Sequence, residues 1–220
     1  MSQTFSFSKE THGVGNGLLL QGTTHLRFGA QWDASTRGKA GWLGRISKKG
    51  GLDIDLIGVL MQGQKPVKYV GLSNLNPLKN GTVVHSGDNQ TGHGEGDDET
   101  ITLQLQEIGL EYSSIIFTAS VFKGAKSNMF GSMASATQDK GFKGADNVEF
   151  SVYDVTTGEA SWTRVIMPSL LGRDNCCIIA KVSRTSPSDQ SAPWQIEVLE
   201  KMVSITPDDM DSIYEKCLGL

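Results

Sequence analysis

The sequence predicts an all-β protein, an antiparallel β-sandwich with a short C-terminal helix, and three observations lead to this fold class. Apolar residues mostly recur at every second position, which is the period of a half-buried strand. The runs at 115–122 (IIFTASVF) and 148–155 (VEFSVYDV) are rich in the β-branched and aromatic residues that strands favour. Turn-forming pairs such as Asn80-Gly81 separate the apolar runs at short intervals. About eight or nine short strands with glycine-rich connections are typical of a sandwich.

The strands are expected in the following order along the chain. The first lies around Leu26 to Trp32, where apolar and polar residues alternate. The second, at 52–61 (LDIDLIGVLM), is apolar on one face in its first half and on both faces in its second half. The remaining strands are predicted at 82–86, 101–105, 115–122, 148–155, 160–167, 177–183 and 194–199. Residues 124–147 are rich in Gly, Ser and Lys, and we expect a long loop there, of the kind that is often functional.

The C-terminal helix is predicted at about 207–218. Thr206 is suited to cap it, Pro207 to occupy its first position, and the two following aspartates complement the helix dipole. Gly219 is suited to end it. An apolar stripe with helical spacing indicates a helix that packs on its own sandwich rather than on a partner; the stripe consists of Met210, Ile213, Tyr214 and Cys217.

The length of 220 residues fits a single domain over 1–220. A chain of this size buries roughly 70% of its unfolded surface and needs no disulfide bonds. Its three cysteines offer no obvious pair, because Cys176 and Cys177 are adjacent, and their odd number indicates a reducing compartment. We find no apolar stretch long enough to cross a membrane and no secretory signal at the start, so the expected location is the cytoplasm.

The net charge of −4 conceals a local excess of acid. No Lys or Arg occurs between Lys79 and Lys123, while the same interval contains seven acidic residues: Asp88, Glu95, Asp97, Asp98, Glu99, Glu107 and Glu111. A block of one sign favours a partner of the opposite sign, which here is a cation. Nucleic acid is not expected as a partner, since no basic stripe with interleaved aromatic residues is present.

The segment Gly87 to Glu99 (GDNQTGHGEGDDE) carries the chemistry. Five of its residues are carboxylates and four are glycines, which allow the tight turns that bring backbone carbonyls inward. Calcium takes six to eight oxygen ligands from carboxylates, amides and backbone carbonyls, and the segment supplies all three kinds. It is not an EF-hand loop, because His93 stands where that loop requires its turn glycine.

Asp53 and Asp55 extend the predicted metal site. At positions i and i+2 of a strand their side chains project from the same face, about 7 Å apart, so both can approach one ion or two neighbouring ions. On an otherwise apolar strand, two carboxylates need a compensating charge. The alternative interpretation is that they lie near a solvated strand end.

These residues resemble the tellurium-resistance TerD family. The similarity spans roughly residues 15 to 205. It rests on Trp32-Asp33, LDID at 52–55, Asn74, VHSGDNQTG at 84–92 and GEGDDE at 94–99. Weaker matches follow at Phe130-Gly131, Arg164, Arg184 and Trp194.

The resemblance implies an antiparallel β-sandwich that binds two calcium ions, in bacterial operons linked to resistance to tellurite, phage and other stress. The implied metal ligands are Asp53, Asp55, Asp88, Asn89, Asp97, Asp98 and Glu99, with backbone oxygens of 91–94 as additions.

The chain departs from the family at several points. The serine of the family's Asp-Leu-Asp-Ala-Ser run is lost at 53–57, its Ile-His-Asp is replaced at 121–123, about ten residues are inserted after Gly131, and an acid is lost at 180–184. These departures indicate a divergent member whose calcium core is kept and whose partner surface differs.

Two other kinds of site compete with this interpretation. His85 and His93 flank the acidic segment, but tetrahedral zinc sites use clusters of His and Cys, and no Cys lies near them in sequence. A metal-dependent phosphoester hydrolase would also need clustered carboxylates, to hold two ions about 4 Å apart. Against it, we find no evident general base and no Lys or Arg in the acidic block to hold a phosphate.

The favoured function is therefore a non-enzymatic calcium-binding module that scaffolds or signals with protein partners of the same stress system. The alternative function is a two-metal phosphoester hydrolase. Peripheral association with a membrane stays open.

Overall fold

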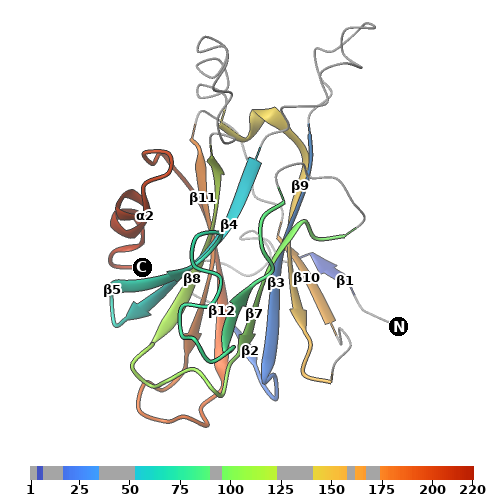
Figure 1. Cartoon of the computed structure of the whole chain (residues 1–220). Helices are drawn as coiled ribbons and strands as arrows, with labels where there is room; N and C mark the ends of the chain where they lie inside the picture. Colours follow the sequence, from blue (N-terminus) through green and yellow to red (C-terminus); the bar gives the residue numbers. More distant parts are fainter. Residues whose placement is uncertain are drawn as a thin grey trace, which may run out of the picture.

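The computed structural model describes residues 4–6, 17–34, 53–89, 96–122, 141–157, 162–166 and 174–220. Within these ranges the chain forms two six-stranded sheets that pack face to face, with one short α-helix on the outside (Figure 1). All strand neighbours are antiparallel except β1 and β10. The predicted class, an antiparallel β-sandwich with a short C-terminal helix, is confirmed.

The first sheet, called sheet A, contains in spatial order β1 (Thr4–Ser6), β10 (Trp162–Ile166), β9 (Ala145–Asp154), β3 (His25–Ala34), β7 (Glu99–Gln104) and β6 (Val83–His85). The second sheet, called sheet B, contains β2 (Leu18–Leu20), β12 (Trp194–Val203), β11 (Cys176–Arg184), β8 (Ser114–Phe122), β4 (Asp53–Gln62) and β5 (Lys65–Val70). Every strand that the sequence predicted is present. The 3-10 helix η3 (Gly141–Gly144) and the start of β9 occupy the end of the predicted loop at 124–147. The rest of that loop, to residue 140, lies outside the described residues.

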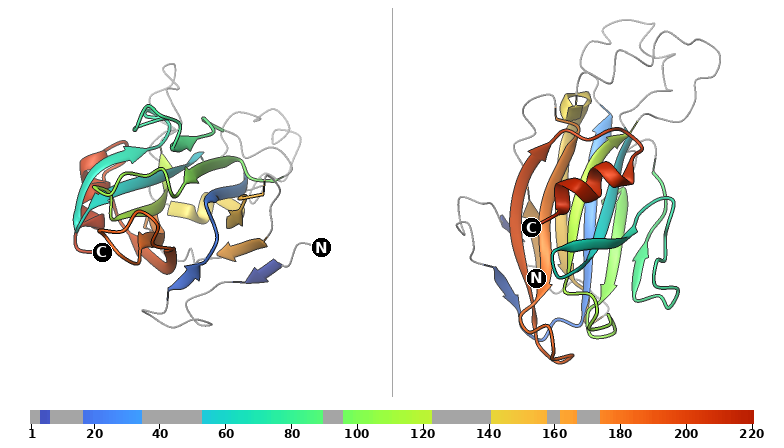
Figure 2. Two further views of the ribbon diagram at one scale, coloured as in Figure 1. Left: turned by 90° about the horizontal axis from the view of Figure 1, so that it is seen from below. Right: turned by 90° about the vertical axis from the view of Figure 1, so that its left-hand side faces the viewer.

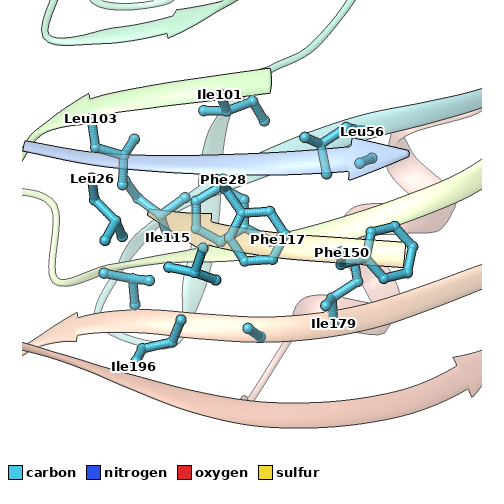
Figure 3. Packing of buried hydrophobic residues seen from close by; sticks show 14 of the residues in the cluster. Leu26, Phe28, Leu56, Ile101, Leu103, Ile115, Phe117, Phe150, Ile179 and Ile196 are labelled. Atoms are coloured by element: carbon cyan, nitrogen blue, oxygen red, sulfur yellow. The ribbon is translucent and has the colours of Figure 1, made fainter. Parts of the chain in front are cut away.

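The core lies between the two sheets. Phe28 of β3 and Phe117 of β8 stack across it, with ring centroids 4.2 Å apart and planes 6° from parallel. Isoleucine and leucine side chains from both sheets surround this pair (Figure 3). Burial of these alternating residues is the main term that holds the two sheets together, since it removes apolar surface from water.

Helix α2 (Met210–Cys217) covers the outer face of sheet B (Figure 2). Ile213 and Cys217 are buried there, in a second apolar cluster that also contains Ile57, Val59, Met61, Ile116, Cys176 and Ile178. Met210 and Tyr214 pack against the same cluster, so the predicted apolar stripe is confirmed. No helix in the described part of the chain is long and apolar enough to cross a membrane.

The predicted start of this helix is wrong. The helix begins at Met210 rather than Pro207, and its N-cap is Asp209, whose side chain accepts a hydrogen bond from the Asp211 N–H at 3.1 Å. Asp208 has φ of +60°, in the left-handed region, so the backbone cannot continue a right-handed helix through this residue. The TPDD sequence forms a turn before the helix instead of its first turn.

Candidate metal centre

The start of β4 is an open edge of sheet B. Strand β8 pairs with β4 from Asp53 to Met61, but β5 pairs with it only from Gly58 onward. On the side of β4 away from β8, where β5 does not reach Leu56, the backbone of Leu56 forms hydrogen bonds to two side chains of sheet A instead. Its N–H donates to Glu99 Oε2 at 2.8 Å, and its carbonyl lies 3.1 Å from His85 Nε2. Side chains from one sheet thus close the edge of the other.

The hydrogen bonds of His85 at this junction select one tautomer of its ring. Its Nδ1 accepts a hydrogen bond from the Gly87 N–H at 3.0 Å, so the proton of the neutral ring lies on Nε2 and is donated to the Leu56 carbonyl. Glu99 Oε2 lies 3.4 Å from the same nitrogen. Both ring nitrogens are engaged, which leaves neither for zinc. His93, the other histidine considered for a transition metal, lies outside the described residues.

Glu99 is fully buried and connects the loop after β6 to β4. In addition to the Leu56 N–H, its carboxylate accepts a hydrogen bond from the Asn89 N–H at 3.3 Å. The Asn89 side chain donates to Asp98 Oδ1 at 2.7 Å, and Asp98 Oδ2 accepts from the Trp32 N–H at 2.9 Å. These contacts place the loop segment 86–89 beside the start of β4.

The result is a group of three carboxylates, Asp53, Asp55 and Asp88. One oxygen from each lies within 4.8 Å of the others. Asp53 is 9% exposed and Asp55 6% exposed, whereas Asp88 is exposed, so the group is enclosed by protein on the β4 side and open to water on the loop side. We call it the carboxylate group below.

Burial and mutual repulsion act strongly on this group. Burial, followed by the charges of Glu99, Asp53, Asp88 and Asp208, raises the pKa of Asp55 from 3.8 to about 8. Burial, followed by the charges of Asp88, Glu99 and Asp208, raises the pKa of Asp53 to about 6. Every side-chain charge that these shifts involve, within the described residues, is a carboxylate. A bound cation would relieve this cost directly.

Asp53 also has a buried oxygen with no partner. Its Oδ1 accepts no hydrogen bond from any described residue. A buried carboxylate oxygen without a donor or a cation is costly, because it has lost its hydration without replacement. The oxygen-only donor set, the charge and this oxygen fit a hard cation such as calcium.

Asp97 lies elsewhere, on the outer face of sheet A. Its carboxylate accepts a hydrogen bond from the Tyr153 hydroxyl at 3.3 Å, and the Arg27 guanidinium lies 4.5 Å from the centre of the Tyr153 ring. Gly29 makes room for it, because a Cβ there would lie 2.2 Å from the Asp97 carboxylate. Burial still raises the pKa of Asp97, and the Tyr153 hydrogen bond and the Arg27 charge oppose this rise.

Of the seven residues predicted as ligands, the structure therefore brings three into one group and sets three beside it as a hydrogen-bonded support: Asn89, Asp98 and Glu99. Asp97 is separate from both. The predicted backbone ligands at 91–94 lie outside the described residues. Sequence reasoning missed Asp208, whose charge acts on Asp53 and Asp55. The only signal for it was an acidic pair before the C-terminal helix.

Comparisons with known proteins agree with this fold. The TerD domain model matches residues 18–176. Tellurium resistance protein TerZ of Serratia marcescens is 34% identical over 129 residues, which cover 58% of this chain and 61% of that protein. Tellurium resistance protein TerX of the same organism is 30% identical over 170 residues, which cover 66% of this chain and 78% of that protein. Stress response protein SCP2 of Bacillus subtilis is 30% identical over 105 residues, which cover 46% of this chain and 52% of that protein.

A solved structure shows the same fold. The structure of a homologue of telluride resistance protein TerD from Streptomyces coelicolor superimposes with a TM-score of 0.60 at 16% identity. The superposition covers 84% of this chain and 94% of the other.

Proposed function

The chain belongs to the TerD family, and on that premise we propose that it is a non-enzymatic calcium-binding protein of a bacterial tellurium-resistance and stress system. The observation that carries the proposal is the convergence of Asp53, Asp55 and Asp88 at the open edge of β4, where one buried oxygen of Asp53 has no partner among the described residues. An arrangement of this kind is unfavourable in the folded chain unless a cation balances it.

Calcium suits the group better than magnesium does. Calcium accepts irregular shells of six to eight oxygens, whereas magnesium requires near-ideal octahedral geometry and retains its waters. Asp53, Asp55 and Asp88 would hold the ion, with Glu99 close behind them. The resemblance to the family implies two ions. The second would draw on Asn89 and Asp98, which lie beside the carboxylate group, and on the backbone oxygens predicted at 91–94, whereas Asp97 is set apart from them on the outer face of sheet A.

The hydrolase alternative gains no support from the site. The side-chain charges that act on Asp53 and Asp55 are carboxylates, as far as the structure describes them, so a phosphoester would meet repulsion and no cationic clamp. We therefore keep the scaffold or signalling role, with protein partners of the same stress system in the cytoplasm. A turnover screen on model phosphodiesters with calcium, magnesium and manganese tests the enzyme alternative, and turnover that is lost in Asp53→Asn would reinstate it.

Calorimetric titration of the full chain with calcium tests the proposal. We expect binding at least about tenfold tighter than that of magnesium, and a large loss of calcium affinity in Asp53→Asn. Glu107→Gln is the matched control, because Glu107 is an exposed acid of the same acidic block. Its affinity should equal that of the parent. Absence of calcium binding by the parent, or equal binding by Asp53→Asn, would contradict the proposal.

A further inference from the structure

The carboxylates of β4 share a strand face with the residues that the C-terminal helix covers. Ile54 and Leu56 point into the core between the sheets, whereas Ile57 and Val59 belong to the cluster under α2. Because side chains alternate along a strand, Asp53 and Asp55 lie on the α2 side. The carboxylate group is therefore situated where the outer face of sheet B meets the open edge of β4.

The strand register brings the C-terminal segment to the same level. Asp55 is opposite Ser120 of β8, Ser120 is opposite Cys176 of β11, and Cys176 is opposite Val203 of β12. These four residues form one row across sheet B. The chain leaves β12 at the end of this row and crosses the outer side of the sheet before α2 begins (Figure 2, right).

Two contacts fix the path of this crossing. Asn175, next to the row, donates a hydrogen bond to the Ile205 carbonyl at 3.1 Å and accepts one from the Ile205 N–H at 2.9 Å. Further along, Thr206 N–H donates to the Ser212 hydroxyl at 3.0 Å. Between these two contacts the chain makes a left-handed turn at Asp208, whose charge is the weakest of those that raise the pKa of Asp53 and Asp55.

The row also contains a buried polar atom that no described residue satisfies. Ser120 is fully buried and its Oγ has no hydrogen-bond partner there. It stands directly across from Asp55, on the same face of the sheet. The outer face of sheet B is therefore polar next to the carboxylates and apolar under the helix.

We propose that the segment Thr206–Cys217 is part of the metal centre, with Asp208 as a fourth carboxylate, and that cation binding is coupled to the docking of α2 on sheet B. This inference rests on the proposed calcium function. Without a cation, Asp208 is repelled by the other acids and the segment is held less firmly; with a cation it is attracted. Coupling of this kind is reciprocal, so loosening the helix must also weaken cation binding. The segment lies beyond the matched TerD domain, which ends at residue 176.

The test compares Asp208→Asn with Glu215→Gln in the full chain. Asparagine tolerates the left-handed conformation of position 208, so the backbone is retained and only the charge is lost. Glu215 is an exposed acid on α2 and serves as the matched control. Calorimetry should show calcium affinity about three- to tenfold weaker in Asp208→Asn, as expected for one missing charge near a divalent ion, and unchanged in Glu215→Gln.

Hydrogen exchange provides a readout that a charge effect alone would not move. Addition of calcium to the parent should slow exchange of the α2 amides, and this protection should shrink in Asp208→Asn. In Ile213→Ala, which removes a buried contact of the helix, calcium affinity should fall although Ile213 lies outside the carboxylate group. The melting curve of that variant shows whether the sandwich remains folded.

The proposal requires both the affinity loss and the calcium-dependent protection of α2. If the parent binds calcium but either result is missing, the inference is overturned and the calcium function stands. If the parent binds no calcium, the proposed function itself fails.

Discussion

Glu99 and Asp98 accept hydrogen bonds from the backbone N–H groups of β3, β4 and the loop after β6. Asp53 and Asp55, on β4 itself, are instead affected by the charges of other carboxylates. Both sets are acidic and at least partly buried. The two sets differ in whether hydrogen-bond donors of the protein compensate the negative charge of the carboxylates.

In the first set, backbone N–H groups provide this compensation, and their hydrogen bonds to the carboxylates also hold the loop against the sheet. Such carboxylates contribute to stability at all times, because their partners are built into the fold. In the second set the protein supplies almost none, and a buried oxygen of Asp53 has no partner among the described residues. Asp53 and Asp55, whose charge the described residues leave unbalanced, are therefore better candidates for cation ligands than Asp98 and Glu99.

The largest effect is expected for Glu99→Ala. It leaves the buried Leu56 N–H without its acceptor and removes the link between the loop and β4, so the free energy of unfolding should fall by about 2–4 kcal/mol. Urea unfolding of calcium-depleted protein measures this. A loss that appears only when calcium is present would mean that Glu99 acts as a ligand and not as a structural anchor.

A second effect is expected from pH. Burial raises the pKa of Asp55 from its ordinary value of 3.8 to about 8, so the folded state favours the neutral form of this carboxyl. The calcium-free protein should be most stable near pH 4 with respect to this group and should lose stability as pH rises toward 8. Calcium affinity should rise over the same interval, because protons compete with the ion.

Unfolding and calcium titrations across this range provide the check. A calcium affinity that does not change between pH 5 and 8 would show that protons do not occupy the carboxylate group. Asp55→Asn should flatten both profiles, while a surface change such as Glu107→Gln should leave them as in the parent.

The smallest effect is expected for Asp97→Asn. Because Asp97 accepts a hydrogen bond from Tyr153 on the outer face of sheet A and is favoured there by the charge of Arg27, its loss should reduce calcium affinity less than Asp53→Asn does. Calorimetry of the two variants side by side measures the difference. An equal loss would show that Asp97 contributes to the calcium site as much as Asp53 does, and would contradict the separation of the two acidic regions.

Most strands of the fold could be predicted from the sequence, for physical reasons that differ between elements. Alternation revealed β3 and the branched apolar run revealed β8, but β5 was missed because Pro66 and two lysines mask a polar edge strand. β1 and β2 are too short to show a period. The helix start was misplaced because nothing local marks the left-handed turn at Asp208.

The approach of the acidic segment to Asp53 and Asp55 could be predicted for a similar reason. The spacing of Asp53 and Asp55 shows that they share a face, and the acidic segment supplies the nearby charge. Which neighbouring acid points where depends on backbone donors from distant segments, so the separation of Asp97 from Asp98 and Glu99 could not be predicted. The approach of Asp208 depends on a crossing that joins distant parts of the chain.

The most direct test of the central claim is the stability of Asp53→Asn measured twice, by chemical unfolding of calcium-depleted protein and of protein saturated with calcium. Removing an unbalanced charge relieves repulsion, so we expect the variant to be more stable than the parent without calcium. With calcium it should be less stable, because the stabilisation by a bound ion depends on its affinity. A change of the same sign in both conditions would contradict the account.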